Sequence, residues 1–527
     1  MARDMVIIKH PFILAWKIEL EWKDVENFSE WDPVLLRDFT EYFPEDGLSK
    51  VIQGFLKGEL SPFPTEEEVQ ETAQAESSDE KPEVAEVAEL AVEDRLILMS
   101  NGLEQSSDSI ISHRIMAQLF LNLEEYASAV EVARKGVSII KDITRKTGLA
   151  LRQTTDYVNT TLATALISYQ SPRNHPEAKS IFESILKRKP KNTKCLLGIG
   201  LILEEDHDYE EAYNFLQRAR ERDPSNVKIR SELAWCTALN GDLQSGLEIL
   251  EDVLAQIRDD ETQTREFKAE ILYRIGHCKW ELDPSSAARK DRDGAYASFL
   301  ASIQADLNYA PAYTRLGIYY ADYKKDKSRA KRCFHKAFEL SSSEIEAAER
   351  LAKSFANKQE WDLVEAVAQR VVDSGKAKPA PGSKRKGDSW PYAALGVVQL
   401  NKQQYTKSIV SYQAALRISP GDYHSWVGLG ESYHNSGRYI AATKAFEHAE
   451  ALESGLSKKE TNNIWFSKYM LANVKRELGE YDDAIGRYEA VLAIRPNEFG
   501  VMIALLQTLT ESAWKNLETG LFNEAAK

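Results

Sequence analysis

The sequence predicts an all-α protein, a superhelical solenoid of stacked antiparallel helix pairs. The first observation is a pattern that recurs at 34-residue spacing: a large residue, Leu-Gly, an aromatic residue, then Ala, a large residue and Ala. The clearest copy consists of Trp426, Leu429, Gly430, Tyr433, Ala442, Phe446 and Ala449. The preceding copy consists of Tyr392, Leu395, Gly396, Ser408, Tyr412 and Ala415, and Pro420 ends it.

The second observation is that small residues alternate with large ones inside each copy. Two antiparallel helices approach closely only where their contact points carry almost no side chain, as at Gly430 and Ala442, while Trp426 and Phe446 fill the remaining space. A single pair exposes too much apolar surface to be stable alone, so each unit needs its neighbours. This combination is typical of the tetratricopeptide repeat (TPR).

Further copies of the pattern cover most of the chain. Earlier copies contain Met116, Leu162, Leu196 and Leu233, and later ones contain Leu272, Tyr313, Leu351 and Leu471. The Tyr313 copy has one inserted residue, and Leu282–Asp293 lengthens the hairpin of the Leu272 copy. A last unit around Leu505 is truncated, so residues 94–527 are expected to hold about ten units. We expect a piece of a longer protein, or a chain whose end a partner covers.

Three segments depart from the repeats. Residues 1–64 are expected to form degenerate TPR-like helices at Phe12–Trp22, Pro33–Tyr42 and Leu48–Leu60. Residues 65–93 are Glu-rich and, in their first part, lack aromatic residues, which predicts an acidic flexible insert. Residues 374–389 carry Lys384, Arg385 and Lys386 and predict a basic surface loop between two helices.

Composition narrows the possible functions. A net charge of −15 argues against non-specific nucleic-acid binding by the whole surface. No run of about 18 apolar residues occurs, so no membrane span and no membrane partner are predicted. Met1–Lys17 lacks the apolar run of a secretory signal. The four cysteines contain no Cys-x-x-Cys pair, which favours reduced thiols and a location in the cytoplasm, with the nucleus as a second location.

The residues do not predict an enzyme. No convergent nucleophile, base and orienting group is apparent, so no catalytic residue, cofactor or metal site is predicted. The nearest metal-like cluster, Glu204–Asp208, falls on a turn between two helices, where solvated charges are the simpler interpretation. Binding of a chaperone carboxylate is disfavoured, because Lys468 and Asn473 are five residues apart instead of four.

The concave surface is the expected interaction site, because repeat proteins usually act through it. The positions predicted to contact a partner are Leu197, Leu201, Ile318, Val397, Leu400, His424 and His434. Either a bound peptide or helix covers these apolar positions, or an internal segment does; we favour an internal or subunit contact. Lys384, Arg385 and Lys386 are candidates for contact with RNA or an acidic partner, and a solvated linker is the simpler interpretation.

Two blocks, Tyr313–Ala352 and Trp390–Leu452, support a narrower assignment. Beyond the generic repeat positions, the first block contains Arg329-Ala330-x-x-Cys333-Phe334-x-Lys336-Ala337. The second contains Trp390-Pro391 after a basic insertion, and Ser419-Pro420-Gly421-Asp422 before Trp426. In these features the chain resembles the large TPR scaffold subunits of superkiller (Ski) complexes. Members are much longer, so the resemblance implies an N-terminal or central portion.

The resemblance implies a non-catalytic cytoplasmic scaffold. Such subunits hold a DExH-box RNA helicase and WD40 propeller subunits, which feed RNA to the cytoplasmic exosome; contact of the scaffold with RNA is then weak or indirect. An alternative is a TPR regulatory or substrate-recruiting region of an enzyme such as a glycosyltransferase, whose catalytic domain lies outside this chain.

Overall fold

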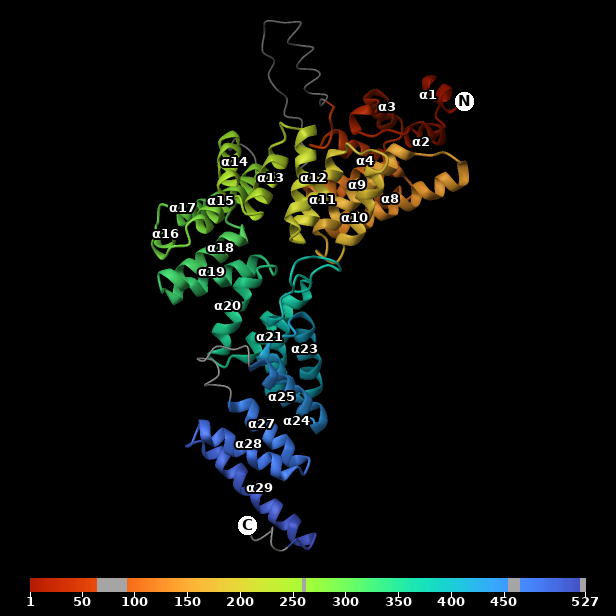
Figure 1. The fold of residues 1–527 in the computed structure, drawn as a ribbon. Helices are drawn as coiled ribbons and strands as arrows, with labels where there is room; N and C mark the ends of the chain where they lie inside the picture. Colours follow the sequence, from red (N-terminus) through yellow and green to blue (C-terminus); the bar gives the residue numbers. More distant parts are fainter. Residues whose placement is uncertain (64–91, 258–261, 454–464, 522–527) are drawn as a thin grey trace. The chain divides into compact units, whose positions relative to one another are not determined.

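The computed structural model describes residues 1–63, 92–257, 262–453 and 465–521 (Figure 1). Within these ranges every regular element is a helix and there is no β-strand. Helices that follow one another in the chain pack against each other as successive pairs. The all-α TPR fold predicted from the sequence is therefore confirmed. Most of the acidic insert expected at 65–93 lies outside the described residues.

The chain divides into two compact units. The first contains Met1–Gly241 with Ala380–Ser383, and the second contains Asp242–Pro379 with Lys384–Lys527. The division falls inside the predicted repeat that contains Leu233, so the two helices of that repeat belong to different units. No helix in the described ranges has both the length and the apolar character needed to cross a bilayer.

The first unit starts with short helices that match the predicted N-terminal segments. Its first elements are α1 (Ala2–Ile7), α2 (Ile13–Glu21), the 3-10 turn η1 (Phe28–Glu30), α3 (Pro33–Tyr42) and α4 (Gly47–Leu56). Asp32 and Asp46 begin α3 and α4 by accepting hydrogen bonds from backbone N–H groups of the first turn, and Pro33 occupies the position where no N–H is needed. The buried rings of Trp16, Phe39 and Phe55 join these helices to one core.

Helix α4 pairs with α6 (Val92–Gln105), so the residues between 63 and 92 connect the two helices of one packed pair. The helices meet where glycine faces glycine: a β-carbon on Gly102 would lie 2.7 Å from the carbonyl oxygen of Gly47. A β-carbon on Gly54 would lie 2.2 Å from Cγ of Met99. This pair therefore follows the same rule of close approach as the repeats.

Alternating first and second helices of repeats complete the first unit. They are α7 (Ile110–Asn122), α8 (Tyr126–Thr147), α9 (Arg152–Ser168), α10 (His175–Leu186), α11 (Thr193–Glu205), α12 (Tyr209–Arg222) and α13 (Val227–Leu239). The first helices α7, α9, α11 and α13 also contact one another in sequence, which forms a continuous face. Packing is tight: a β-carbon on Gly200 would lie 2.7 Å from Leu216.

The second unit also consists of helices in its described residues. Its helices are α14 (Leu243–Gln256), α15 (Thr262–Leu282), α16 (Ser286–Lys290), α17 (Ala295–Ala305), α18 (Ala310–Ile318), η2 (Tyr319–Tyr323), α19 (Lys327–Leu340), α20 (Ile345–Ala356), α21 (Trp361–Asp373), α22 (Trp390–Asn401), α23 (Tyr405–Ile418), α24 (Tyr423–Asn435), α25 (Tyr439–Glu453), α27 (Trp465–Glu477), α28 (Tyr481–Ile494) and α29 (Phe499–Glu518). The insertion Leu282–Asp293 contains α16.

The single residue inserted in the Tyr313 repeat has a clear structural outcome. Directly after α18 the chain forms the π-helical turn η2, which is one residue wider than an α-helical turn. The extra residue is thus absorbed inside the helix, and Gly317 still meets Phe334, whose ring would lie 2.5 Å from a β-carbon on the glycine. The repeat contacts are kept in spite of the broken spacing.

Candidate partner-binding groove

A cavity of about 490 Å³ lies on the face formed by the first helices of the first unit. Its walls come from α7, α9 and α11, from Lys228 on α13, and from Glu26 and Asn27 just before η1. Leu197 and Leu201, both predicted to face the groove, line this cavity and are half-buried. They lie near Leu121 and Ile167 of the other first helices, which also line it. The groove therefore has an apolar floor.

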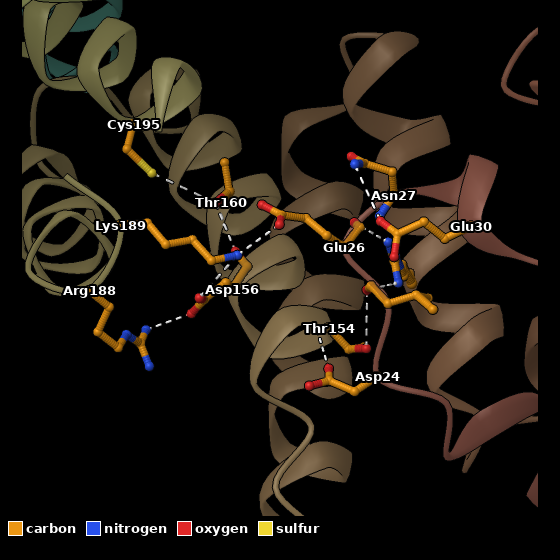
Figure 2. Close-up of polar contacts among 12 residues, drawn as sticks. Asp24, Glu26, Asn27, Glu30, Thr154, Asp156, Thr160, Arg188, Lys189 and Cys195 are labelled. Carbon is orange, nitrogen blue, oxygen red and sulfur yellow. Dashed lines mark hydrogen bonds and ion pairs between the residues drawn. The ribbon is translucent and has the colours of Figure 1, made fainter. Parts of the chain in front are cut away.

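An internal segment, residues 24–31, borders one end of this groove. The carboxylate of Asp24 accepts a hydrogen bond from the backbone N–H of Thr154 at 2.9 Å (Figure 2). The guanidinium of Arg114 donates to the carbonyl oxygen of Val25 at 2.9 Å and to that of Glu26 at 2.5 Å. The backbone at Asn27 is extended. The segment thus binds to the repeats largely through its own carbonyl groups and carboxylates.

Arg114 is the anchor of this segment. Its side chain is 1% exposed, and its guanidinium lies 4.1 Å from the ring centroid of Tyr157, 5.1 Å from that of Phe28 and 5.2 Å from that of Trp31. Burial lowers the pKa of Arg114 to about 10, so the group stays protonated at neutral pH. The aromatic rings and the carbonyl oxygens together compensate the buried charge.

A second set of contacts fixes Glu26 to α9 and to the loop after α10. The ammonium of Lys189 lies 2.9 Å from the carboxylate of Glu26 and 3.8 Å from that of Asp156 (Figure 2). Arg188 also donates to Asp156, at 2.5 Å. Burial raises the pKa of Asp156, and the neighbouring Arg188 and Lys189 lower it. An acidic side chain of the internal segment is therefore held by a lysine at the edge of the groove.

Two further lysines lie along the groove. Lys194 and Lys228 are the second residues of α11 and α13 and stand 34 residues apart, at the same repeat position. Neither forms an ion pair with any residue in the described ranges; the ammonium of Lys194 lies 5.6 Å from the ring centroid of Tyr157. Hydroxyl groups of Thr161 and Tyr157 donate to the amide oxygen of Gln118 on the floor. The groove thus combines apolar and basic surfaces.

The other predicted groove residues lie in the second unit. Val397 is 38% exposed and Leu400 is half-buried. Ile318 is only 7% exposed, because α18 is covered by α17, α19 and α20; the expected exposure of this side chain is wrong. His424 is exposed and His434 half-buried, and they lie at opposite ends of α24, so they do not form a common site. Their contacts with a partner stay predictions.

The basic loop has a more specific structure than a solvated linker. Arg385 donates to the carbonyl oxygen of Lys376 at 2.8 Å and lies 3.6 Å from the carboxylate of Asp388, and its side chain is 14% exposed. Lys384 and Lys386 are exposed. The arginine therefore stabilises the loop, whereas Lys384 and Lys386 lie on its exposed surface.

The acidic turn Glu204–Asp208 does not gather around a common centre. Glu205 accepts a hydrogen bond from the hydroxyl of Ser171 at 2.6 Å and lies 3.5 Å from the buried His175. His207 adopts a left-handed backbone conformation, φ 60°, in the turn between α11 and α12. Throughout the described ranges, no three His, Cys, Asp or Glu side chains are placed to hold a metal ion.

Sequence reasoning missed the internal segment and Arg114. The available signal was an arginine inside the mostly apolar segment from Ile110 to Phe120. A charged residue in such a run is buried only when it is paired, so a partner had to exist elsewhere in the chain. Residues 24–31 border the groove at Glu26 and Asn27, and the expectation that an internal or subunit contact covers the apolar positions stays a prediction.

Comparison with known proteins agrees with the repeat assignment. The tetratricopeptide repeat family matches residues 203–271, 391–422, 423–454 and 469–501. Among solved structures, the Cut9–Hcn1 hetero-tetramer of the APC/C aligns with 96% of this chain and 95% of that chain, at 14% identity and a TM-score of 0.42.

Curated relatives match over most of the chain. Superkiller protein 3 of Schizosaccharomyces pombe is 32% identical over 547 residues, which cover 100% of this chain and 38% of the relative. Superkiller protein 3 of Saccharomyces cerevisiae is 27% identical, covering 97% of this chain and 38% of the relative. Human superkiller complex protein 3 is 24% identical, over 76% of this chain and 21% of its own length. The chain thus spans well under half of these relatives, and it belongs to the family of tetratricopeptide repeat proteins that includes superkiller protein 3.

Proposed function

We propose that this chain is a non-catalytic scaffold region of a cytoplasmic superkiller-type complex. In this role it holds a DExH-box RNA helicase and WD40 propeller subunits, which deliver RNA to the cytoplasmic exosome, and its own contact with RNA is weak or indirect. The observation that carries the proposal is the similarity to superkiller protein 3 over 100% of the chain. A regulatory region of a glycosyltransferase-like enzyme has no comparable observation in its favour.

The architecture supports a scaffold role on physical grounds. Each helix pair buries its apolar face against the next pair, so the surface positions along a unit are held at fixed spacing. The groove of the first unit offers the apolar side chains of Leu197 and Leu201 to a ligand. Concave sites that combine apolar side chains with a few polar groups are typical ligand sites.

The test is affinity purification of the full-length protein from its own cells, followed by identification of the partners present in stoichiometric amounts. We expect an RNA helicase and WD40 subunits to be retained, and the exosome to be present in smaller amounts. A matched control carries Lys141→Glu and Lys146→Glu, two exposed positions on α8 away from the groove, and should retain the same partners. Recovery of neither subunit with the wild-type protein would refute the proposal.

A further inference from the structure

We propose that the groove of the first unit binds an extended acidic segment of a partner protein. Carboxylates of that segment bind Lys194 and Lys228, and its apolar side chains pack on Leu197 and Leu201. This inference rests on the proposed function, in which the chain assembles with other proteins, and it names the chemistry of one partner segment.

The chain itself provides a precedent for this chemistry at the end of the same groove. Residues 24–27 have the sequence Asp-Val-Glu-Asn and bind to the repeats without forming a helix. Asp24 accepts from the backbone of α9, Glu26 pairs with Lys189 at 2.9 Å, and the carbonyl groups between them accept from Arg114. This surface therefore already accommodates a short acidic segment of the chain itself.

The groove continues beyond Glu26 and Asn27 along α9, α11 and α13. There the basic groups are Lys194 and Lys228, which no described residue neutralises. Neighbouring helices pack about 8–10 Å apart, which equals roughly three residues of a polyproline II segment, at about 3.1 Å per residue. Because this conformation has three residues per turn, acidic residues spaced three apart face the same side and match lysines on consecutive first helices.

The groove fits a peptide better than single-stranded RNA. RNA binding usually needs an aromatic ring with an open face for base stacking. The aromatic residue of this groove is Tyr157, and the guanidinium of Arg114 lies 4.1 Å from its centroid.

The test uses the protein with substitutions in the groove and a labelled probe. The probe is a fluorescent nine-residue peptide of Glu-Leu-Ser repeats. A peptide of Lys-Leu-Ser repeats and a labelled oligo-uridine RNA serve as comparisons. Binding of each labelled molecule is measured by fluorescence anisotropy. The groove variant carries Lys194→Glu and Lys228→Glu. The control carries Lys141→Glu and Lys146→Glu, which change the net charge equally but lie outside the cavity. Circular dichroism and thermal unfolding confirm that both variants are folded.

We expect the acidic peptide to bind the wild-type protein and the control, and to bind the groove variant at least about tenfold more weakly. Leu197→Ser should weaken binding by several-fold without changing its salt dependence. Equal binding of the acidic and basic peptides, an equal loss in the control, or a loss in the groove variant that affects only the RNA would each overturn the inference.

Partner retention by the same variants separates this inference from the proposed function. If the peptide does not bind but the full-length protein retains its helicase and WD40 subunits, the inference fails alone. If the wild-type protein retains neither subunit, the proposed function fails, whatever the peptide does.

Discussion

The ring of Phe446 packs on the backbone of Gly430 so closely that a β-carbon on the glycine would lie 2.7 Å from Cε1 of the ring. Phe446 is completely buried, so the ring has little space to move away. Gly430→Ala should therefore destabilise this repeat by about 1–3 kcal/mol through overpacking, which outweighs the gain of about 1 kcal/mol from helix propensity. Urea unfolding and hydrogen exchange of α24 and α25 measure the effect.

The matched control is Gly486→Ala in α28. No atom lies within 4 Å of the β-carbon that this substitution adds, and the position is inside a helix. We expect stabilisation by about 0.5–1 kcal/mol, since alanine loses less conformational freedom than glycine. If Gly430→Ala and Gly486→Ala change the free energy of unfolding in the same direction, close helix packing is not the reason for the glycine at position 430.

The repeat fold could be predicted because each slot of the pattern encodes a local contact. Gly430, Gly396 and Gly317 each face a buried aromatic ring of the next helix, and that helix follows within about twenty residues. Each such contact is therefore visible in the sequence as a regular spacing between the glycine and its aromatic partner. An insertion of one residue after Gly317 does not destroy the pattern, because the π-helical turn η2 absorbs it.

The candidate site could be predicted only in part. Leu197 and Leu201 follow from the helical period, because groove-facing positions repeat along a first helix. The contact between Asp24 and Thr154 joins residues 130 positions apart, and no repeated sequence pattern predicts it. Ile318 illustrates the opposite failure: its position in the pattern is right, but neighbouring helices cover it. Long-range packing decides both cases.

Glu21 should make the stability of the first unit depend on pH. Its carboxylate is buried at the start of α7, where Ser109 and the backbone N–H of Ile110 donate to it. Burial raises the pKa of Glu21 to about 7, although these hydrogen bonds lower it. Between the unfolded pKa of Glu21, about 4.3, and its folded pKa, about 7, the folded state binds more protons than the unfolded state. Stability therefore falls as pH rises through this range, by about 4 kcal/mol.

Thermal unfolding at pH 5 and pH 8 checks this prediction. Glu21→Gln should flatten the pH dependence, because an amide does not titrate in this range. Glu19→Gln, at a half-exposed position of the same helix, is the control and should keep the wild-type slope. An equal slope in the wild type and in Glu21→Gln would show that another group causes the pH dependence.

Arg114 should control the order of residues 24–31. Arg114→Lys keeps a positive charge but loses the planar group that lies over Tyr157 and donates to two carbonyl oxygens. We expect a loss of about 2–4 kcal/mol in the free energy of unfolding, since buried acceptors are left without donors. Hydrogen exchange of residues 24–31 should become faster, while exchange in α12 changes little.

The control for this substitution is Arg134→Lys. Arg134 pairs with Glu177 at 2.7 Å, but both side chains are about half exposed. Such a surface pair contributes little, so the change should stay within about 0.5 kcal/mol. If Arg114→Lys lowers the free energy of unfolding no more than Arg134→Lys does, the packing of the Arg114 guanidinium over Tyr157 does not hold residues 24–31 in place.

The cysteines should differ in reactivity according to burial. Burial raises the pKa of Cys195 and Cys278 to about 11 and that of Cys236 to about 12, and all three side chains are buried. Cys333 has a raised pKa but is half-buried. In the folded protein at pH 8, a disulfide reagent that releases a coloured thiolate should modify Cys333 first and the other three only after unfolding. Rapid modification of all four in the folded state would contradict the packing.

The exposed lysines of the basic loop can be separated from the arginine that stabilises it. Lys384→Gln combined with Lys386→Gln removes exposed charge and leaves the contacts of Arg385 with Lys376 and Asp388 intact. Because we expect contact with RNA to be weak or indirect, retention of single-stranded RNA by the full-length protein should change less than about threefold, as with Lys141→Gln and Lys146→Gln. Arg385→Gln should instead accelerate hydrogen exchange across residues 376–388, because it removes the hydrogen bond to Lys376. A tenfold loss of RNA with the double lysine variant alone would identify the loop as a direct RNA contact.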